Sequence, residues 1–567
     1  MRGSEGGEAT PPDSCSIFAE PAHRFVREVG SQVSICRVLT FRGLEMRGDG
    51  VLMQDFVEAL YRMDADADSV GIYELLKSIR YDASQIFHVC QHMLIHKRLM
   101  AAYILALLLK SAGMRHAVIG LALCAGGMVY GKPAEEQGGL EMLREQTDSQ
   151  SVEQQRFMDE TVISPVIVHL LNIALPLPNR DHLILRIIEI LKAMAPPFRT
   201  IFDWDAPVPA LSLEEMRKRG REEAHLLPIL LPPPGAPRLQ KRVLIMIAQQ
   251  HGNGYSFASA MNNYGWQAEV CGRNLSAATA QDDCRAIIDM CRSKKIDILM
   301  LDANQIGGYN RQIGWDAYKQ MRNQMREEMP LLKVLGVVFD SNDTIERAIL
   351  EEMWDLYDGL LSHLHDPLAP HILSNPWYAK KIKHMLFCPM DDRNICKPDK
   401  KFIPNLYFRG TICAGHWPRL LWLSVADHVG INVKKDINTF SYNSELYKNS
   451  PLDDYAAYRR RVAESTCFFG IVMLEGQKRY LNSRCFEGNL SGALVVQEYS
   501  PITRNYFIAG EHYLEYYTIS DLLSIVRFIN EHPEEVAEIR LRGHTFACDR
   551  YSDEKIVGQI DKFLFFP

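Results

Sequence analysis

Three kinds of residue that can hold a phosphorylated ligand occur together near the C-terminus, in the run Arg484-Cys485-Phe486-Glu487-Gly488. A guanidinium pairs bidentately with diphosphate oxygens, a carboxylate accepts hydrogen bonds from ribose hydroxyls, and a glycine lets the backbone approach a ligand closely. Arg484 and Glu487 are three residues apart, so on a helix they share one face. The pattern fits a nucleotide site. It also fits a surface salt bridge, which is the commoner meaning of such a pair.

A second candidate is the loop Gln250-His251-Gly252-Asn253-Gly254, which directly follows an apolar run. Two glycines in a turn after a strand present backbone N–H groups to a ligand. His251 is the only titratable side chain of this loop, so we predict that it acts as the base toward an acceptor hydroxyl. A solvated histidine in an ordinary strand-to-helix turn is the alternative interpretation.

Both motifs lie after about residue 240, where short apolar runs alternate with turns and helical segments. Runs that are apolar at nearly every position are typical of parallel strands covered on both faces. The sequence therefore predicts the α/β class, with two tandem Rossmann-like domains whose ligands gather at the carboxyl ends of the strands. The predicted strands are Val243–Ala248, Gln267–Cys271, Ile296–Leu301, Val334–Phe339 and Asp358–Ser362, then Leu406–Phe408, Gly430–Val433, Cys467–Met473 and Ala493–Val496.

The part of the chain before residue 205 has a different pattern. Apolar residues recur there at three- and four-residue spacing, as in Ile184, Ile188 and Leu191, which predicts an all-α region of helices stacked as antiparallel pairs. The segment 226–237, with five prolines and a glycine, predicts an extended spacer after it. The predicted helix breaks are Gly113, Gly126-Gly127, Pro176-Leu177-Pro178 and Pro196-Pro197.

The bulk composition excludes several classes of protein. With 63 basic and 70 acidic side chains the net charge is −7, which provides no basic surface for nucleic acid. Thirteen cysteines without a Cys-x-x-Cys pair indicate reduced thiols and a cytoplasmic location, with a peripheral position at the inner face of the membrane as the alternative. Charged residues interrupt the apolar stretch Leu99–Val129, so we expect two buried helices there rather than a membrane span. No signal peptide is expected at the N-terminus.

Beyond the run Arg484–Gly488, a longer pattern extends toward the C-terminus. It resembles the C-terminal domain of bacterial family-1-like glycosyltransferases, in particular the spore-maturation CgeB-like group. Weaker similarities reach back to about residue 240. The residues that carry the resemblance are Arg484, Phe486, Glu487, Gly492, Leu494 and Glu498, followed by Phe507–His512, Tyr516, Asp521, His544, Phe546 and Arg550.

The resemblance implies the GT-B fold, in which the first Rossmann-like domain binds an acceptor and the second a nucleotide sugar. By position, Arg484 would neutralise the phosphate of the leaving group, Glu487 would hold the ribose, and a turn at Gly410 would lie beside the diphosphate. Many retaining members carry a second glutamate eight residues after the first, and Val495 occupies that position here. The stereochemical outcome is therefore left open. The further donor-binding candidates are Gly488, Glu498, Glu511 and His512.

On this basis the predicted domains are a tail (1–50), a helical domain (51–225), a proline-rich linker (226–240), an acceptor-side Rossmann-like domain (241–385) and a nucleotide-sugar-binding Rossmann-like domain (386–567). The Asp-x-Asp spacings fall in the helical half, so no metal site and no cofactor beyond the nucleotide sugar are expected.

The expected activity is transfer of a sugar from a nucleoside-diphosphate sugar to a hydroxyl of a glycan, lipid or protein. Two alternatives remain. One is a catalytically degenerate nucleotide-sugar-binding or scaffold protein that uses its helical domain for protein partners. The other is a nucleotide-sugar epimerase.

Overall fold

The structure is a computed structural model. It describes residues 50–566 with gaps, of which the longest are 148–161, 272–279, 303–314, 339–355, 363–381, 385–405, 440–461 and 474–483. The contacts divide the chain into two compact units, cut between Trp204 and Asp205, with Leu420–Val425 grouped with the first unit. Each unit is described by itself below.

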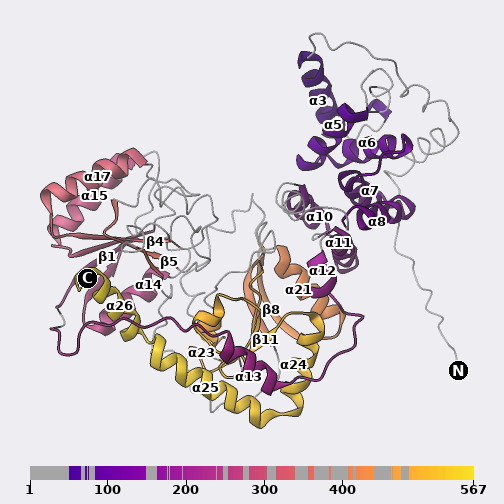
Figure 1. Cartoon of the computed structure of the whole chain (residues 1–567). Coiled ribbons are helices and arrows are strands. Elements are labelled where there is room, and N and C mark those ends of the chain that lie inside the picture. Colours follow the sequence, from indigo (N-terminus) through magenta and orange to yellow (C-terminus); the bar gives the residue numbers. More distant parts are fainter. Residues whose placement is uncertain are drawn as a thin grey trace, which may run out of the picture. The chain divides into compact units, whose positions relative to one another are not determined.

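The first unit is helical, as the apolar spacing predicts (Figure 1). Neighbouring helices along the chain pack on each other, with α5 on α6, α6 on α7 and α7 on α8. Its helices are α3 (Gly50–Ala65), α5 (Ala83–Ile95), α6 (Leu99–Ser111), α7 (Ala117–Val129), α8 (Pro133–Thr147), α10 (Ser164–Ala174), α11 (Arg180–Met194) and α12 (Pro196–Ile201).

The stretch Leu99–Val129 forms two buried helices, α6 and α7, as expected. Among the residues that the structure describes, no helix has both the length and the apolar character needed to cross a membrane. Gly113 ends α6 with a φ of +81°, a conformation that side chains other than glycine adopt at a cost.

The predicted break at Gly126-Gly127 is wrong, because both glycines lie inside α7. They allow close packing instead. A Cβ at Gly126 would lie 2.3 Å from the ring of Tyr103 on α6, and one at Gly127 would lie 2.7 Å from the backbone nitrogen of Glu136 on α8. These glycines therefore let α7 approach both of its neighbours, and the helix continues through them.

The second unit begins with a parallel sheet of six strands in the order β2-β1-β3-β4-β5-β6. The strands are β1 (Arg242–Met246), β2 (Gln267–Val270), β3 (Ile298–Asp302), β4 (Lys333–Val338), β5 (Gly359–Ser362) and β6 (Ile382–His384). Helices α15 (Ala280–Ser293) and α17 (Trp315–Glu328) cover one face of the sheet, and α14 (Asn253–Tyr264) covers the other (Figure 1).

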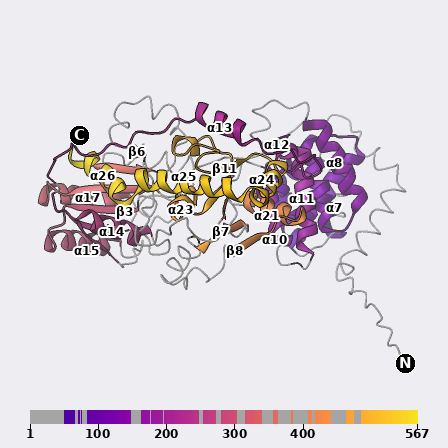
Figure 2. The same ribbon diagram turned by 90° about the horizontal axis from the view of Figure 1, so that it is seen from below.

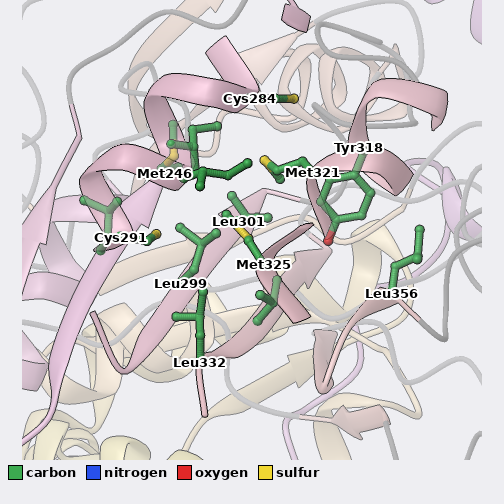
Figure 3. Packing of buried hydrophobic residues seen from close by; sticks show 14 of the residues in the cluster. Met246, Cys284, Cys291, Leu299, Leu301, Tyr318, Met321, Met325, Leu332 and Leu356 are labelled. Carbon is green, nitrogen blue, oxygen red and sulfur yellow. The ribbon is translucent and has the colours of Figure 1, made fainter. Parts of the chain in front are cut away.

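The core of this first Rossmann-like domain lies between the sheet and the pair α15 and α17. Leu299 and Leu301 of β3 pack against Met321 and Met325 of α17, and Tyr318 closes one side of the cluster (Figure 3). These side chains are almost completely buried, so they secure the helices to the sheet mainly by removing apolar surface from water.

A second parallel sheet follows, with five strands in the order β11-β10-β9-β7-β8. The prediction of two tandem Rossmann-like domains after an all-α region is thus confirmed. Its strands are β7 (Leu406–Ile412), β8 (Val433–Thr439), β9 (Cys467–Gly470), β10 (Leu494–Glu498) and β11 (Leu514–Tyr516), with helices α21 (Trp417–His428) and α23 (Arg484–Leu490) between them.

Two expectations for this sheet need correction. Gly410 does not form a turn, because β7 continues through it to Ile412 and pairs with β8 along that length. The predicted strand at Gly430–Val433 starts only at Val433, since Gly430 has a φ of +82° and belongs to the turn after α21. In both places the order of strand and turn depends on pairing with a neighbouring strand, which a local pattern does not encode.

The chain ends in three helices, α24 (Ile519–Glu531), α25 (Pro533–Tyr551) and α26 (Asp553–Phe565), of which α25 leads into α26 (Figure 2). Helix α26 leaves the second domain and packs on α14 of the first. The Tyr264 hydroxyl donates to Asp561 over 3.0 Å, and a Cβ at Gly359 would lie 2.3 Å from the ring of Phe563. The C-terminal helix is therefore part of the first Rossmann-like domain.

The segment between the helical region and β1 also belongs to the second unit. It contains α13 (Leu213–Glu222) and the proline-rich stretch, which has neither helix nor strand where it is described. The backbone N–H of Leu227 donates to the carbonyl of Asn505 over 2.9 Å. The predicted domain boundaries themselves stay predictions.

Candidate active site

The strand order of the second sheet indicates where a ligand would bind. From β7 the chain moves to β8 on one side, and then to β9 and β10 on the other side. The order therefore reverses between β7 and β9. In open parallel sheets the crevice outside the carboxyl ends of the two strands at such a reversal is the usual ligand site. Here that edge is formed by Gly410–Ile412 and by residues 471–473, which follow Gly470.

Arg484, the first residue of α23, reaches this edge of the sheet. Its Nε donates to the carbonyl of Arg409 over 2.9 Å, and its guanidinium lies over the ring of Phe408, 5.2 Å from the centroid. A Cβ at Gly410 would lie 2.3 Å from its Nη2. The structure thus brings together two predicted site residues, Arg484 and Gly410, because the glycine leaves the space that the guanidinium occupies.

Glu487 lies in the first turn of α23 and is 4% exposed, and Gly488 beside it is buried. A Cβ at Gly488 would lie 2.6 Å from Cγ2 of Val495, so this glycine brings the helix close to β10. The burial of Glu487 does not fit the alternative of a surface salt bridge, since such pairs are solvated. Its predicted contact with a ribose stays a prediction.

Glu498 is the last residue of β10 and is completely buried. Its Oε2 accepts hydrogen bonds from the backbone N–H groups of Val472 and Met473, each 2.9 Å long. These residues follow β9 at the strand reversal. Glu498 therefore shapes one wall of the candidate site by holding its backbone, while Val495, at the position of the absent second glutamate, is buried within β10.

Glu511 and His512 have side-chain partners outside α23. Glu511 forms an ion pair with Arg221 of α13. His512 stacks on Phe546 with ring centroids 3.9 Å apart, and its Nδ1 accepts from the N–H of Ile508 over 3.1 Å. Burial lowers the pKa of His512 to about 4, so it is neutral near pH 7 and offers no positive charge to a phosphate. Their predicted donor contacts stay predictions.

The acceptor-side loop follows β1, at the strand reversal of the first sheet between β1 and β3. His251 and Gly252 lie outside the described residues, Asn253 begins α14, and Gly254 is buried in that helix. Asp302, which sequence reasoning left without a role, is the last residue of β3 and is 5% exposed. An acidic residue directly after an apolar run is the signal that could have marked Asp302 as a candidate site residue.

A buried ionic cluster was missed entirely. Arg504, 1% exposed, donates through its Nε and Nη2 to Glu515 of β11 and through Nη1 to Glu223. The hydroxyl of Tyr513 also donates to Glu515, over 2.8 Å. Burial opposes the charged form, but the hydrogen bonds and charge of Glu515 raise the pKa of Arg504 overall. No spacing in the sequence marks these partners, because one of them precedes both Rossmann-like domains.

Comparison with protein families gives one match, which lies in the second Rossmann-like domain. Residues 406–561 match the family described as "Glycosyl transferase-like". The match spans the second sheet and its helices, including the Arg484 and Glu487 segment. No curated protein sequence matches the chain. Among the residues that the structure describes, no group of three or more His, Cys, Asp or Glu side chains could hold a metal ion.

Solved structures similar to the chain include HepE of Anabaena in complex with UDP and glucose, at 9% identity and a TM-score of 0.39, over 58% of this chain and 100% of that one. Sucrose-phosphate synthase of Thermosynechococcus elongatus is similar at 12% identity and a TM-score of 0.36, again over 58% and 100%. A glycosyltransferase of Rickettsia africae is similar at 9% identity and a TM-score of 0.34, over the same shares.

Proposed function

We propose that this protein is a glycosyltransferase that binds a nucleoside-diphosphate sugar at the carboxyl edge of its second sheet. One observation carries the proposal. The glycosyltransferase-like match covers the sheet at whose strand reversal Arg484 lies against Gly410. A guanidinium at this edge is suited to a diphosphate, because its planar fork pairs with two phosphate oxygens.

The chemistry assigns a role to each group. In the transfer the bond from the anomeric carbon to the diphosphate oxygen breaks, and a bond from the acceptor oxygen to that carbon forms. Negative charge develops on the departing diphosphate, where Arg484 stabilises it. The proton of the acceptor hydroxyl goes to a base, for which His251 is the candidate. This scheme stabilises the leaving group with a side chain, so we propose a metal-independent reaction.

Other residues support donor binding. Glu487 accepts hydrogen bonds from the ribose, and Glu498 keeps the backbone after β9 in place for the ligand. We further propose that the protein belongs to the CgeB-like group, that its acceptor is a glycan, lipid or protein hydroxyl, and that the helical unit offers a surface for a protein partner. The burial of Glu487 and the two hydrogen bonds of Glu498 support the donor-binding roles of these two residues.

A panel of nucleoside-diphosphate sugars tests the proposal. The full chain is incubated with each donor, and both thermal stabilisation and release of nucleoside diphosphate are measured, since a ligand that binds the folded state raises the melting temperature. We expect one donor class to bind and turn over. Arg484→Ala should weaken its binding by about tenfold or more, as expected for a charge-assisted contact.

The matched control is Arg527→Ala, which removes an exposed arginine from α24 of the same domain. It should leave donor binding and turnover unchanged. Glu487→Gln, which keeps the side-chain volume, should reduce binding without unfolding the chain. Absence of binding by every donor would contradict the proposal, binding without turnover would indicate a sensor, and interconversion of donors without an acceptor would indicate an epimerase.

A further inference from the structure

Residues 212–227, here called the strap, precede both Rossmann-like domains in sequence but pack on the second one. The strap starts with α13, whose first turn is capped by the Ser212 hydroxyl as it accepts from the N–H of Glu215 over 3.3 Å. A Cβ at Gly220 would lie 2.3 Å from the carbonyl oxygen of Ala509. This contact is between the helix and a backbone, so no side chain larger than hydrogen fits between them.

On the other side of this contact, at Gly510, there is also no room for a side chain larger than hydrogen. Gly510 has a φ of +77°, and a Cβ there would lie 2.8 Å from the backbone nitrogen of Arg217. The Nε of Arg217 donates to the Gly510 carbonyl over 3.0 Å. Further along, the N–H of Leu227 donates to Asn505 and its carbonyl accepts from Arg550 over 2.7 Å. The strap is thus fitted to this domain by its backbone over most of its length.

Charged side chains of the strap complete the buried cluster around Arg504. Arg219 lies 3.8 Å from the carboxylate of Glu515, and Glu223 accepts from Arg504. Arg504 and Glu515 are almost fully buried, whereas Arg219 and Glu223 are 42% and 44% exposed at their side chains. The strap therefore adds one positive and one negative charge at the mouth of a buried ion pair, where charges interact more strongly than in open solvent.

Two stacked tyrosines continue this cluster to the carboxyl ends of the strands. Tyr499 follows β10 and Tyr517 follows β11, and their rings stack with centroids 4.3 Å apart. The guanidinium of Arg219 covers Tyr517 at 4.6 Å and that of Arg504 covers Tyr499 at 5.2 Å. A cation over each ring of the pair holds both strand ends by cation–π attraction.

From these strand ends, hydrogen bonds lead to the strand reversal. The backbone N–H of Tyr499 donates to the carbonyl of Tyr516 over 2.8 Å. The hydroxyl of Tyr516 donates to the carbonyl of Gly470, the last residue of β9, over 2.9 Å. Val472 and Met473, whose N–H groups Glu498 holds, follow immediately. Contacts therefore run without a break from α13 to the edge of the candidate donor site.

We propose that the strap is a positioning element of the donor site. It fixes the carboxyl ends of β10 and β11, and through Tyr516 the end of β9, so that nucleoside diphosphate binding depends on residues outside both Rossmann-like domains. This inference rests on the proposed donor site of the second sheet. Arg219 and Glu223 are the positioning residues, and neither needs to touch the ligand.

Two double variants of the full chain test the role of the strap. Arg219→Ala with Glu223→Ala removes both strap charges from the cluster and leaves Arg504 and Glu515 paired. Lys218→Ala with Glu222→Ala is the matched control, because it removes one base and one acid from exposed positions of the same helix. Hydrogen exchange of the Tyr499 amide reports on the strand ends, and calorimetry with UDP, GDP and ADP reports on the site.

In the first variant we expect the Tyr499 amide to exchange about tenfold faster, while amides of β1 and β4 keep their rates. The Kd of the nucleoside diphosphate that binds the parent should rise about tenfold, and with the matching donor KM should rise while kcat stays within about twofold. The control variant should match the parent in every measurement. Gly220→Val, which separates α13 from Ala509, should reproduce the first variant.

Other outcomes separate the two proposals. Unchanged exchange in both Arg219→Ala with Glu223→Ala and Gly220→Val would show that the strap does not hold the strand ends. Faster exchange with unchanged Kd would show that it holds them without serving the site, and would overturn the positioning role. A parent chain that binds none of the three diphosphates would contradict the proposed function itself, and the exchange rates would then still decide whether the strap fixes the strand ends.

Discussion

The two parallel sheets each contain a carboxylate that accepts backbone hydrogen bonds next to a strand, but at opposite ends. In the first sheet Asp358 precedes β5, accepts from the N–H of Val334 over 2.7 Å, and forms an ion pair with the buried Arg322. In the second sheet Glu498 ends β10 and holds the N–H groups of two residues after β9. The chemistry of the two groups is similar, and only their place along the strands differs.

This difference separates a structural role from a functional one. Ligands of parallel sheets bind at the carboxyl ends of the strands, so a carboxylate at the amino ends stabilises the sheet without meeting a ligand. Asp358 secures β4 to β5 and neutralises Arg322. Glu498 secures the backbone of Val472 and Met473 at the strand reversal. The conformation of this backbone would affect a ligand bound at that edge. The comparison predicts that substitution of Asp358 lowers stability alone, and that substitution of Glu498 lowers ligand affinity as well.

The largest effect is expected for Asp358→Ala. The substitution leaves Arg322 buried with its hydrogen bond to the Leu356 carbonyl but without its carboxylate partner, and burial already lowers the pKa of this arginine. Loss of one partner of a buried pair should lower the free energy of unfolding by about 3 kcal/mol, measured by urea denaturation. Asp289→Ala, which breaks an exposed pair with Arg292, should cost less than about 0.5 kcal/mol. Reduced nucleoside diphosphate affinity in Asp358→Ala would contradict the comparison.

A smaller loss in the free energy of unfolding is expected when acid protonates His512 of the second domain. The pKa of His512 is about 4 in the folded protein and near 6.5 in the unfolded chain, so the unfolded chain binds the extra proton between these values. Stability from this group is complete above pH 6.5 and is lost as the pH falls toward 4. Between pH 7.5 and pH 5 the loss should be about 2 kcal/mol.

The measurement for His512 is the difference between parent and His512→Asn in urea unfolding at the two pH values. Asparagine keeps an acceptor for the N–H of Ile508 but does not titrate in this range. Its stability should therefore fall less in acid than that of the parent. Equal pH dependence in the two proteins would show that His512 is not held neutral by its surroundings.

The smallest change in stability, about 1 to 2 kcal/mol, is expected for Glu498→Gln, because the amide weakens the two charge-assisted hydrogen bonds but keeps the volume. Its main effect should be a rise of about tenfold in the Kd of the bound nucleoside diphosphate, measured by calorimetry. Glu531→Gln, at an exposed position of α24, is the control. If Glu498→Gln lost stability but kept the affinity of the parent, Glu498 would be structural in the same sense as Asp358.

Much of the fold could be predicted because its signals are local. The apolar runs that became β1, β3, β4, β9 and β10 mark buried parallel strands, and alternation with helical segments indicates a doubly wound arrangement. The predictions failed where a residue's role depends on a neighbour distant in sequence. The glycines of α7 looked like a break, yet they serve close packing on α6 and α8. Gly410 looked like a turn, yet it makes room for Arg484 within a strand.

The candidate site was predictable only in part for the same reason. Arg484 and Glu487 stand out by type and spacing, and both lie on the helix expected for them. Glu498 also belonged to the predicted set, but its contacts with the backbone after β9 depend on the order of the strands. The cluster of Arg504, Glu515 and Arg219 was invisible, because it joins three segments whose separation along the chain follows no period.

The sequence alone determined the division into a helical region and two α/β domains, and it selected the chemically capable residues near Arg484. Those conclusions rest on local periodicity and residue type, which do not depend on how distant segments meet. The tertiary structure decided which of these residues share the edge between β7 and β9, and that the strap belongs to the second domain. Such contacts arise from strand order and long-range packing, and packing depends on the whole unit at once.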